Sequence, residues 1–128
     1  MRHIKTGSKR GFFQILTSSG NAQAAMMVLR PGQKSGEHVE NEHPNAEQWL
    51  FVISGSGTAR VGKRRVDIRD HSLLLIEKGE PHQIENTGKR RPLVTINFYV
   101  PPAYDAQGEV RLRAKGIAKA VVDAVRRE

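Results

Sequence analysis

The chain has 128 residues, 38% of them hydrophobic, and carries a formal net charge of +8. This length suits one domain, and the absence of cysteine excludes disulfides and thiolate metal ligands. The first seven residues lack the apolar stretch of a secretory signal, and no segment approaches the roughly 20 apolar residues that a membrane span needs. We therefore expect a soluble, cytoplasmic protein that does not enter a membrane.

Eight short apolar or alternating runs predict eight β-strands. Turn-forming residues separate the runs, as in Ser54–Gly57 and Lys78–Pro81. The runs are Gly11–Thr17, Ala22–Leu29, Gln48–Ile53, Thr58–Val61, Arg65–Ile68, Leu73–Ile76, His82–Glu85 and Leu93–Val100. Short strands separated by turn residues at regular intervals indicate an all-β sandwich or barrel.

The C-terminal segment does not follow this pattern of short strands and turns. From Ala114 to Val125, apolar residues recur at helical spacing between charged ones. We expect a β-barrel over residues 1–110 and a C-terminal α-helix, or an amphipathic tail, over residues 111–128 of the same domain. This segment would pack on the barrel or on a second subunit.

The basic charge is partly concentrated in two clusters, Lys63–Arg65 and Lys89–Arg91. Each cluster follows a glycine between two predicted strands, where a hairpin loop is expected. They are interpreted as solvated turns, because the sequence shows no helix-turn-helix, zinc-finger or aromatic RNA-binding motif. A small-molecule partner is therefore favoured, and a nucleic-acid-binding barrel stays as the last alternative.

Residues from Pro31 to Pro101 contain two segments that resemble the two motifs of the cupin superfamily. In the second segment Gly79, His82 and Asn86 keep the family spacing, although Glu77 stands in the position of the motif's proline. The resemblance implies a cupin-type double-stranded β-helix, a jelly-roll barrel, in which His82 is a metal ligand.

The first segment allows two alignments. Counting back from Gly55 places Gln48 in the family's glutamate position, His43 in the second histidine position and Asn41 in the first. Counting forward from Gly32 selects His38 instead. The resemblance thus implies His43, Gln48, His82 and Asn41 as metal ligands, with His38 as the alternative to Asn41.

Strand geometry supports part of this set, because side chains alternate between the two faces of a strand. In an extended chain Asn41 and His43 point the same way, whereas His38 would join them only across an irregular stretch. Gln48 would face the interior with its alternate neighbours, while Trp49 and Phe51 would face outward or contact a dimer partner. His3 and His71 are interpreted as hydrogen-bonded structural or surface residues.

Without thiolates, the site would accept a divalent transition metal such as zinc, manganese, iron, nickel or copper. Two imidazoles and neutral amides leave its charge uncompensated, which favours an anionic ligand; Glu40, Glu42 or Glu47 would restore negative charge or move protons. The resemblance implies a homodimer and an isomerase, lyase or oxygenase acting on a small polar or anionic substrate, such as a sugar or a carboxylic acid. The alternative is a non-catalytic module that binds or stores a small molecule.

Overall fold

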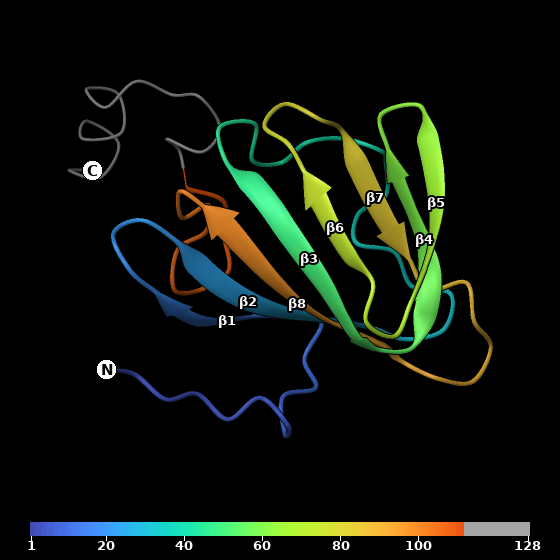
Figure 1. The fold of residues 1–128 in the computed structure, drawn as a ribbon, viewed down its shortest axis with the longest axis horizontal. Helices are drawn as coiled ribbons and strands as arrows, with labels where there is room; N and C mark the ends of the chain where they lie inside the picture. Colours follow the sequence, from blue (N-terminus) through green and yellow to red (C-terminus); the bar gives the residue numbers. More distant parts are fainter. Residues whose placement is uncertain (112–128) are drawn as a thin grey trace.

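The computed structural model describes residues 1–111 and shows two antiparallel β-sheets (Figure 1). The eight strands are β1 (Phe13–Ser18), β2 (Gln23–Leu29), β3 (Glu47–Ser54), β4 (Ser56–Val61), β5 (Arg64–Arg69), β6 (Leu73–Ile76), β7 (His82–Glu85) and β8 (Leu93–Val100). All eight predicted strands are confirmed, with ends that shift by no more than two residues. Apart from Arg111, the segment predicted to be helical lies outside the described residues.

The two sheets join distant parts of the chain. The first has the strand order β1-β2-β8-β3-β6, and the second has the order β5-β4-β7. The last strand, β8, lies between β2 and β3, so the end of the barrel sequence is hydrogen-bonded to its beginning and its middle. Figure 1 shows the second sheet beside the β3–β6 side of the first. The expected all-β barrel is therefore confirmed.

The core lies between the sheets and follows the alternation of side chains along the strands. On β3, Gln48, Leu50 and Val52 are buried, while Trp49 and Ile53 are each 37% exposed. The predicted inward and outward faces of this strand are thus confirmed. Because Gln48 is on the inward face, a polar side chain enters the barrel at the start of β3.

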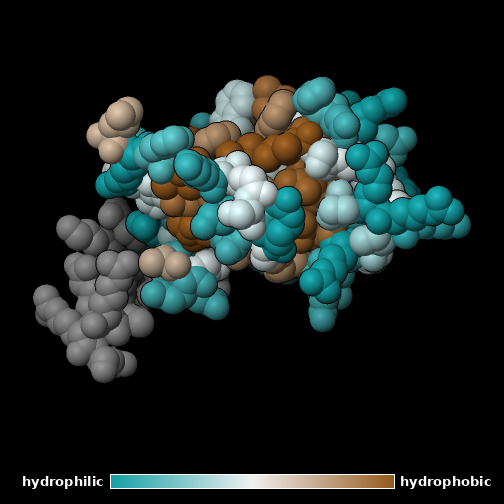
Figure 2. Space-filling model, turned by 90° about the horizontal axis from the view of Figure 1, so that it is seen from below, coloured by the Kyte–Doolittle hydropathy of each residue, from teal (hydrophilic) through white to brown (hydrophobic). Residues whose placement is uncertain are grey.

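The outer face of the five-stranded sheet is apolar, although it is exposed. Trp49 pairs across the ladders with Phe98 on one side and Leu75 on the other. Phe98 is 41% exposed and Leu75 is 39% exposed. Figure 2 shows hydrophobic surface across the middle of the molecule as seen from below. No helix within residues 1–111 is long and apolar enough to cross a membrane.

Candidate metal and ligand site

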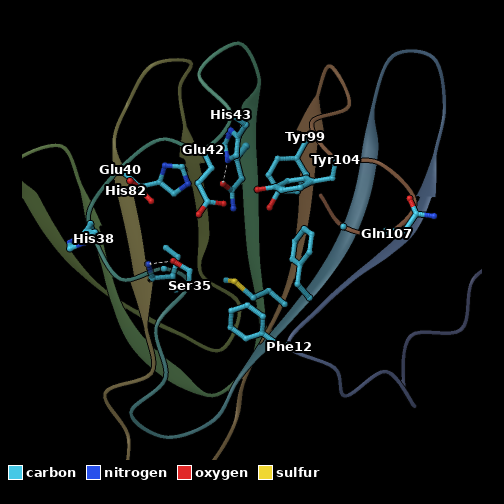
Figure 3. Close-up of a pocket in the computed structure, with 16 residues that line it drawn as sticks. Phe12, Ser35, His38, Glu40, Glu42, His43, His82, Tyr99, Tyr104 and Gln107 are labelled. Atoms are coloured by element: carbon cyan, nitrogen blue, oxygen red, sulfur yellow. Dashed lines mark hydrogen bonds between the residues drawn. The ribbon is translucent and has the colours of Figure 1, made fainter. Parts of the chain in front are cut away.

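A cavity of about 320 Å³ opens into the barrel and has one polar and one aromatic side. His43, His82, Gln48 and Glu42 line the polar part. Tyr99 and Tyr104 lie on the opposite side (Figure 3), and the apolar lining also includes Phe12, Phe13, Met27 and Ile84. This volume lies at the lower end of the range for small-molecule pockets.

Three of the four implied metal ligands meet in this cavity. His43 lies in the loop before β3, Gln48 is the second residue of β3, and His82 begins β7. The centroids of the two imidazole rings are 5.1 Å apart, and His43 Nε2 lies 3.0 Å from Gln48 Oε1. Metal–nitrogen bonds of about 2.1 Å allow two rings on one ion to have centroids up to about 6.5 Å apart. The observed ring separation therefore suits a shared ion.

Backbone carbonyls orient both imidazoles. His43 Nδ1 lies 3.2 Å from the carbonyl oxygen of Ala46, and His82 Nδ1 lies 3.0 Å from that of Glu80. A carbonyl oxygen only accepts hydrogen bonds, so the contact with Glu80 places the proton of a neutral His82 ring on Nδ1, and the contact with Ala46 is compatible with the same tautomer of His43. In this tautomer each Nε2 keeps its lone pair, as in metal-binding histidines whose other nitrogen donates to a carbonyl.

A chain of hydrogen bonds fixes the orientation of Gln48. Thr95 Oγ1 donates to the carbonyl oxygen of Met27 at 2.9 Å and accepts from Asn97 Nδ2 at 3.0 Å. Asn97 Oδ1 must therefore face Gln48, and it accepts from Gln48 Nε2 at 2.8 Å. Because its amide nitrogen is engaged there, Gln48 presents its oxygen to His43. The Met27 carbonyl, which can only accept, thus fixes the direction of each hydrogen bond in this series from Gln48 to Met27.

In the Nδ1–H tautomer of His43 its Nε2 lone pair and Gln48 Oε1 face each other at 3.0 Å as two acceptors, whereas in the other tautomer Nε2 donates to Gln48 Oε1. A metal ion bound by both atoms would satisfy the two acceptors of the first arrangement. His82 supplies a further nitrogen, because burial, followed by the charge of His43, lowers its pKa and favours the neutral imidazole that binds metals. The donor set therefore fits a divalent transition metal.

Asn41 is not brought to the cavity. Its Oδ1 accepts the backbone N–H of His43 at 2.9 Å, and its Nδ2 donates to the carbonyl oxygen of Glu80 at 3.1 Å. The expectation from strand alternation does not apply here, because residues 41–46 form a loop rather than a strand. Asn41 instead joins the loop that carries His43 to the turn that precedes His82.

The loop before β3 brings three other polar residues to the cavity wall, His38, Glu40 and Glu42. The irregular stretch after His38 brings it to the rim, where it is exposed and lies to the far side of His82 in the view of Figure 3. Glu42 extends into the cavity (Figure 3). Within residues 1–111, no group of three or more His, Cys, Asp or Glu could hold a metal ion. A three-ligand site here therefore depends on Gln48.

Tyr99 and Tyr104 line the cavity and were not identified from the sequence. Burial raises the pKa of Tyr99 well above its ordinary value, as does hydrogen bonding with Tyr104. Burial and then the negative charge of Glu42 raise the pKa of Tyr104. Both phenols therefore stay protonated, and because their mutual hydrogen bond raises the pKa of Tyr99 and lowers that of Tyr104, Tyr99 is its donor and the Tyr104 O–H is left for a ligand. Tyr99 shares the inward face of β8 with Asn97, so strand alternation would have found it, whereas Tyr104 lies in a loop without such a signal.

The family model for the cupin domain matches residues 25–99, a span that includes His43, Gln48, His82 and Tyr99. The chain belongs to the cupin domain family. The match ends before Tyr104, so the loop that completes the aromatic wall of this cupin lies beyond the family model.

Two solved structures share the fold of this cupin. A protein from Bacillus halodurans is 30% identical, with 82% of this chain and 80% of that chain covered and a TM-score of 0.71. A cupin-family protein with a double-stranded β-helix fold from Methanocaldococcus jannaschii is 17% identical, with 77% and 87% covered and a TM-score of 0.63. The expected double-stranded β-helix is confirmed.

Among curated proteins, this cupin is similar to the tetracenomycin polyketide synthase protein TcmJ of Streptomyces glaucescens. The two are 35% identical over 89 residues, which cover 67% of this chain and 56% of the relative. The chain spans about half the length of the curated relatives it matches.

Proposed function

We propose that this cupin binds one divalent transition metal ion through His43, Gln48 and His82. The observation that carries the proposal is the fixed direction of the hydrogen bonds from Gln48 to Met27, which turns the Gln48 oxygen toward His43 Nε2. A bound metal ion would supply a Lewis acid with a high effective charge, since all three ligands are neutral.

We further propose that the ligand of the cavity is a small carbonyl or carboxylate compound with an apolar or aromatic body. The aromatic wall suits such a body, while the polar end offers hydrogen-bond donors and the metal to its oxygen atoms. The likeness to a polyketide synthase protein supports this class, because polyketides are carbonyl-rich carbon chains and rings. The cavity wall favours such a compound over a sugar, whose many hydroxyls need more polar partners.

The reaction that this geometry supports best is proton transfer at a carbon next to a carbonyl, as in an isomerase or a lyase. Glu42 extends between His82 and the two tyrosines and would take the proton (Figure 3). Tyr104 would donate a hydrogen bond to the oxygen that becomes negative, and Tyr99, which donates to Tyr104, would strengthen that bond. Among the polar residues of the wall, Glu42 is the one whose charge acts on both phenols.

The metal proposal is tested by titrating metal-free protein with Zn²⁺, Mn²⁺, Fe²⁺, Ni²⁺ and Cu²⁺ in a calorimeter. We expect about one ion per chain and a loss of binding of at least about 100-fold in the His43→Ala, His82→Ala double variant. The matched control is His38→Ala with His71→Ala, which removes two histidines outside the ligand set. Equal losses in both double variants, or full metal content without His43 and His82, would refute the site.

The catalytic proposal is tested by proton exchange in D₂O. Metal-loaded protein is incubated with a panel of aryl ketones and 2-oxo acids, and loss of the C–H signal next to the carbonyl is followed by NMR. Glu42→Gln should abolish the exchange without lowering the metal content, whereas Glu40→Gln, a second carboxylate of the wall, should retain it. A compound that binds at full occupancy without any exchange would assign the cavity to ligand binding or storage instead.

A further inference from the structure

A second cleft, of about 490 Å³, lies at the other end of the barrel from the metal site. Gly55, which follows β3, borders it, and Gly55 is seven residues beyond Gln48, roughly 20 Å along an extended strand. The two cavities have no lining residue in common. The basic cleft is lined by Gly55, Ser56, Arg69, Asp70, Gly88, Lys89, Arg90 and Arg91.

The loop that carries three of these basic residues is held in place by Asn86. The Asn86 side chain is 1% exposed, and its Nδ2 donates to the carbonyl oxygens of Leu29 at 2.9 Å and of Arg91 at 2.8 Å. Its Oδ1 accepts the backbone N–H of Gly88 at 2.9 Å. The predicted solvated turn is therefore closed at both ends by one buried amide, which gives the basic residues a fixed backbone.

The opposite wall is fixed against the same loop. A Cβ atom on Gly55 would lie 2.4 Å from the carbonyl oxygen of Pro92, so the turn between β3 and β4 touches the loop backbone directly. Gly55 has a φ of 99°, which a residue with a side chain rarely adopts. The cleft is thus formed by two loops in backbone contact.

The charges in the cleft are unbalanced. Four cationic side chains face one carboxylate, Asp70, a formal net charge of +3. That carboxylate already accepts the backbone N–H of Gly55 at 2.7 Å. Among residues 1–111, the side chains of Arg69, Lys89, Arg90 and Arg91 have no hydrogen-bond or ion-pair partner. Like charges held close together repel, and a bound anion would offset that repulsion.

We propose that the basic cleft binds the diphosphate or oligophosphate group of a small molecule. Guanidinium groups pair with phosphate oxygens in bidentate fashion, and several cations around one cleft suit a group with two or more negative charges. The lining includes no aromatic side chain on which nucleic-acid bases would stack. The shape and the lining therefore favour a compact phosphorylated ligand over a nucleic acid strand. This site is independent of the proposed metal chemistry.

The test titrates metal-free protein with inorganic pyrophosphate by calorimetry at physiological salt. The cleft variant is Arg90→Ala with Arg91→Ala. The matched control is Arg64→Ala with Arg65→Ala, which removes the same charge from a basic cluster that does not line the cleft. Loss of two charge-assisted contacts should weaken pyrophosphate binding about tenfold or more in the cleft variant, and less than about twofold in the control.

The same titration can also overturn the proposal. Equal weakening in both variants would show that only the overall positive charge attracts the anion. Absence of pyrophosphate binding, or tighter binding of a single-stranded oligonucleotide that both variants weaken, would also refute a small-ligand site. Amide NMR signals of Gly55 and Gly88 should shift with pyrophosphate, and they should still shift in the His43→Ala, His82→Ala variant.

Discussion

Asn97 Oδ1 accepts a hydrogen bond from Gln48 Nε2 at 2.8 Å, and this contact decides which end of the Gln48 amide faces His43. Asn97 is fully buried, and within residues 1–111 its side chain is hydrogen-bonded to Gln48 and Thr95. Its role in the proposed site is therefore to position an oxygen atom. This positioning role can be tested by measuring metal affinity.

Replacing Thr95 by valine should weaken metal binding, although Thr95 contacts no ligand. The change removes the group that receives the Asn97 N–H, so the Asn97 amide is free to turn and the Gln48 oxygen is no longer held toward His43. Outer hydrogen-bond partners of metal ligands commonly contribute about 10- to 100-fold in affinity. Calorimetric titration with Zn²⁺ measures the loss.

The control for this change is Thr58→Val, the same substitution at a buried threonine of the other sheet. It should leave the affinity for Zn²⁺ unchanged. If Thr95→Val and Thr58→Val bind the metal equally well, the hydrogen-bond chain has no part in setting the site.

Replacing Gln48 by glutamate should destabilise the metal-free protein and raise its affinity for divalent metal. A carboxylate cannot donate to Asn97 Oδ1, so two acceptors would face each other in the core and cost about 1–3 kcal/mol. The added negative charge would compensate the metal ion. Thermal unfolding with and without Zn²⁺ should therefore show a larger metal-induced rise in Tm than in the wild type. An equal or smaller rise would count against Gln48 as a ligand.

The two tyrosines should not ionise near pH 10 while the protein is folded. Burial raises the pKa of Tyr99 and that of Tyr104, and these are the only tyrosines of the chain. Since the unfolded chain releases these protons at about pH 10, the free energy of unfolding should fall as pH rises above that value. Absorbance at the tyrosinate band should appear only together with loss of the folded circular dichroism signal. Reversible ionisation of the folded protein near pH 10 would contradict the buried placement.

We expect the protein to form a homodimer through the outer face of the five-stranded sheet. Trp49, Leu75 and Phe98 are exposed neighbours on it, and large apolar patches commonly mark contact surfaces. We propose that Trp49→Lys converts the dimer into a monomer in sedimentation experiments. Val66→Lys is the control, because Val66 is equally exposed, at 37%, on β5 of the other sheet. A wild-type chain that sediments as a monomer would refute the proposal.

The fold was largely predictable because its signal is local. Each strand is a short apolar or alternating run between turn residues, and the inward placement of Gln48 follows from alternation along β3. The placement of Asn41 was not predictable in this way, because alternation requires a ladder and residues 41–46 have none. The role of Asn97 and Thr95 depends on pairing between β2, β3 and β8, which lie far apart in the sequence.

The chain's one tryptophan and two tyrosines lie on opposite sides of the same sheet. Trp49 is on its outer surface, while Tyr99 and Tyr104 line the cavity inside. The tryptophan and the tyrosines are therefore two separate intrinsic spectroscopic probes. Tryptophan fluorescence should respond to subunit association, tyrosine absorbance should respond to a compound entering the barrel, and the two events can be followed in one unlabelled sample.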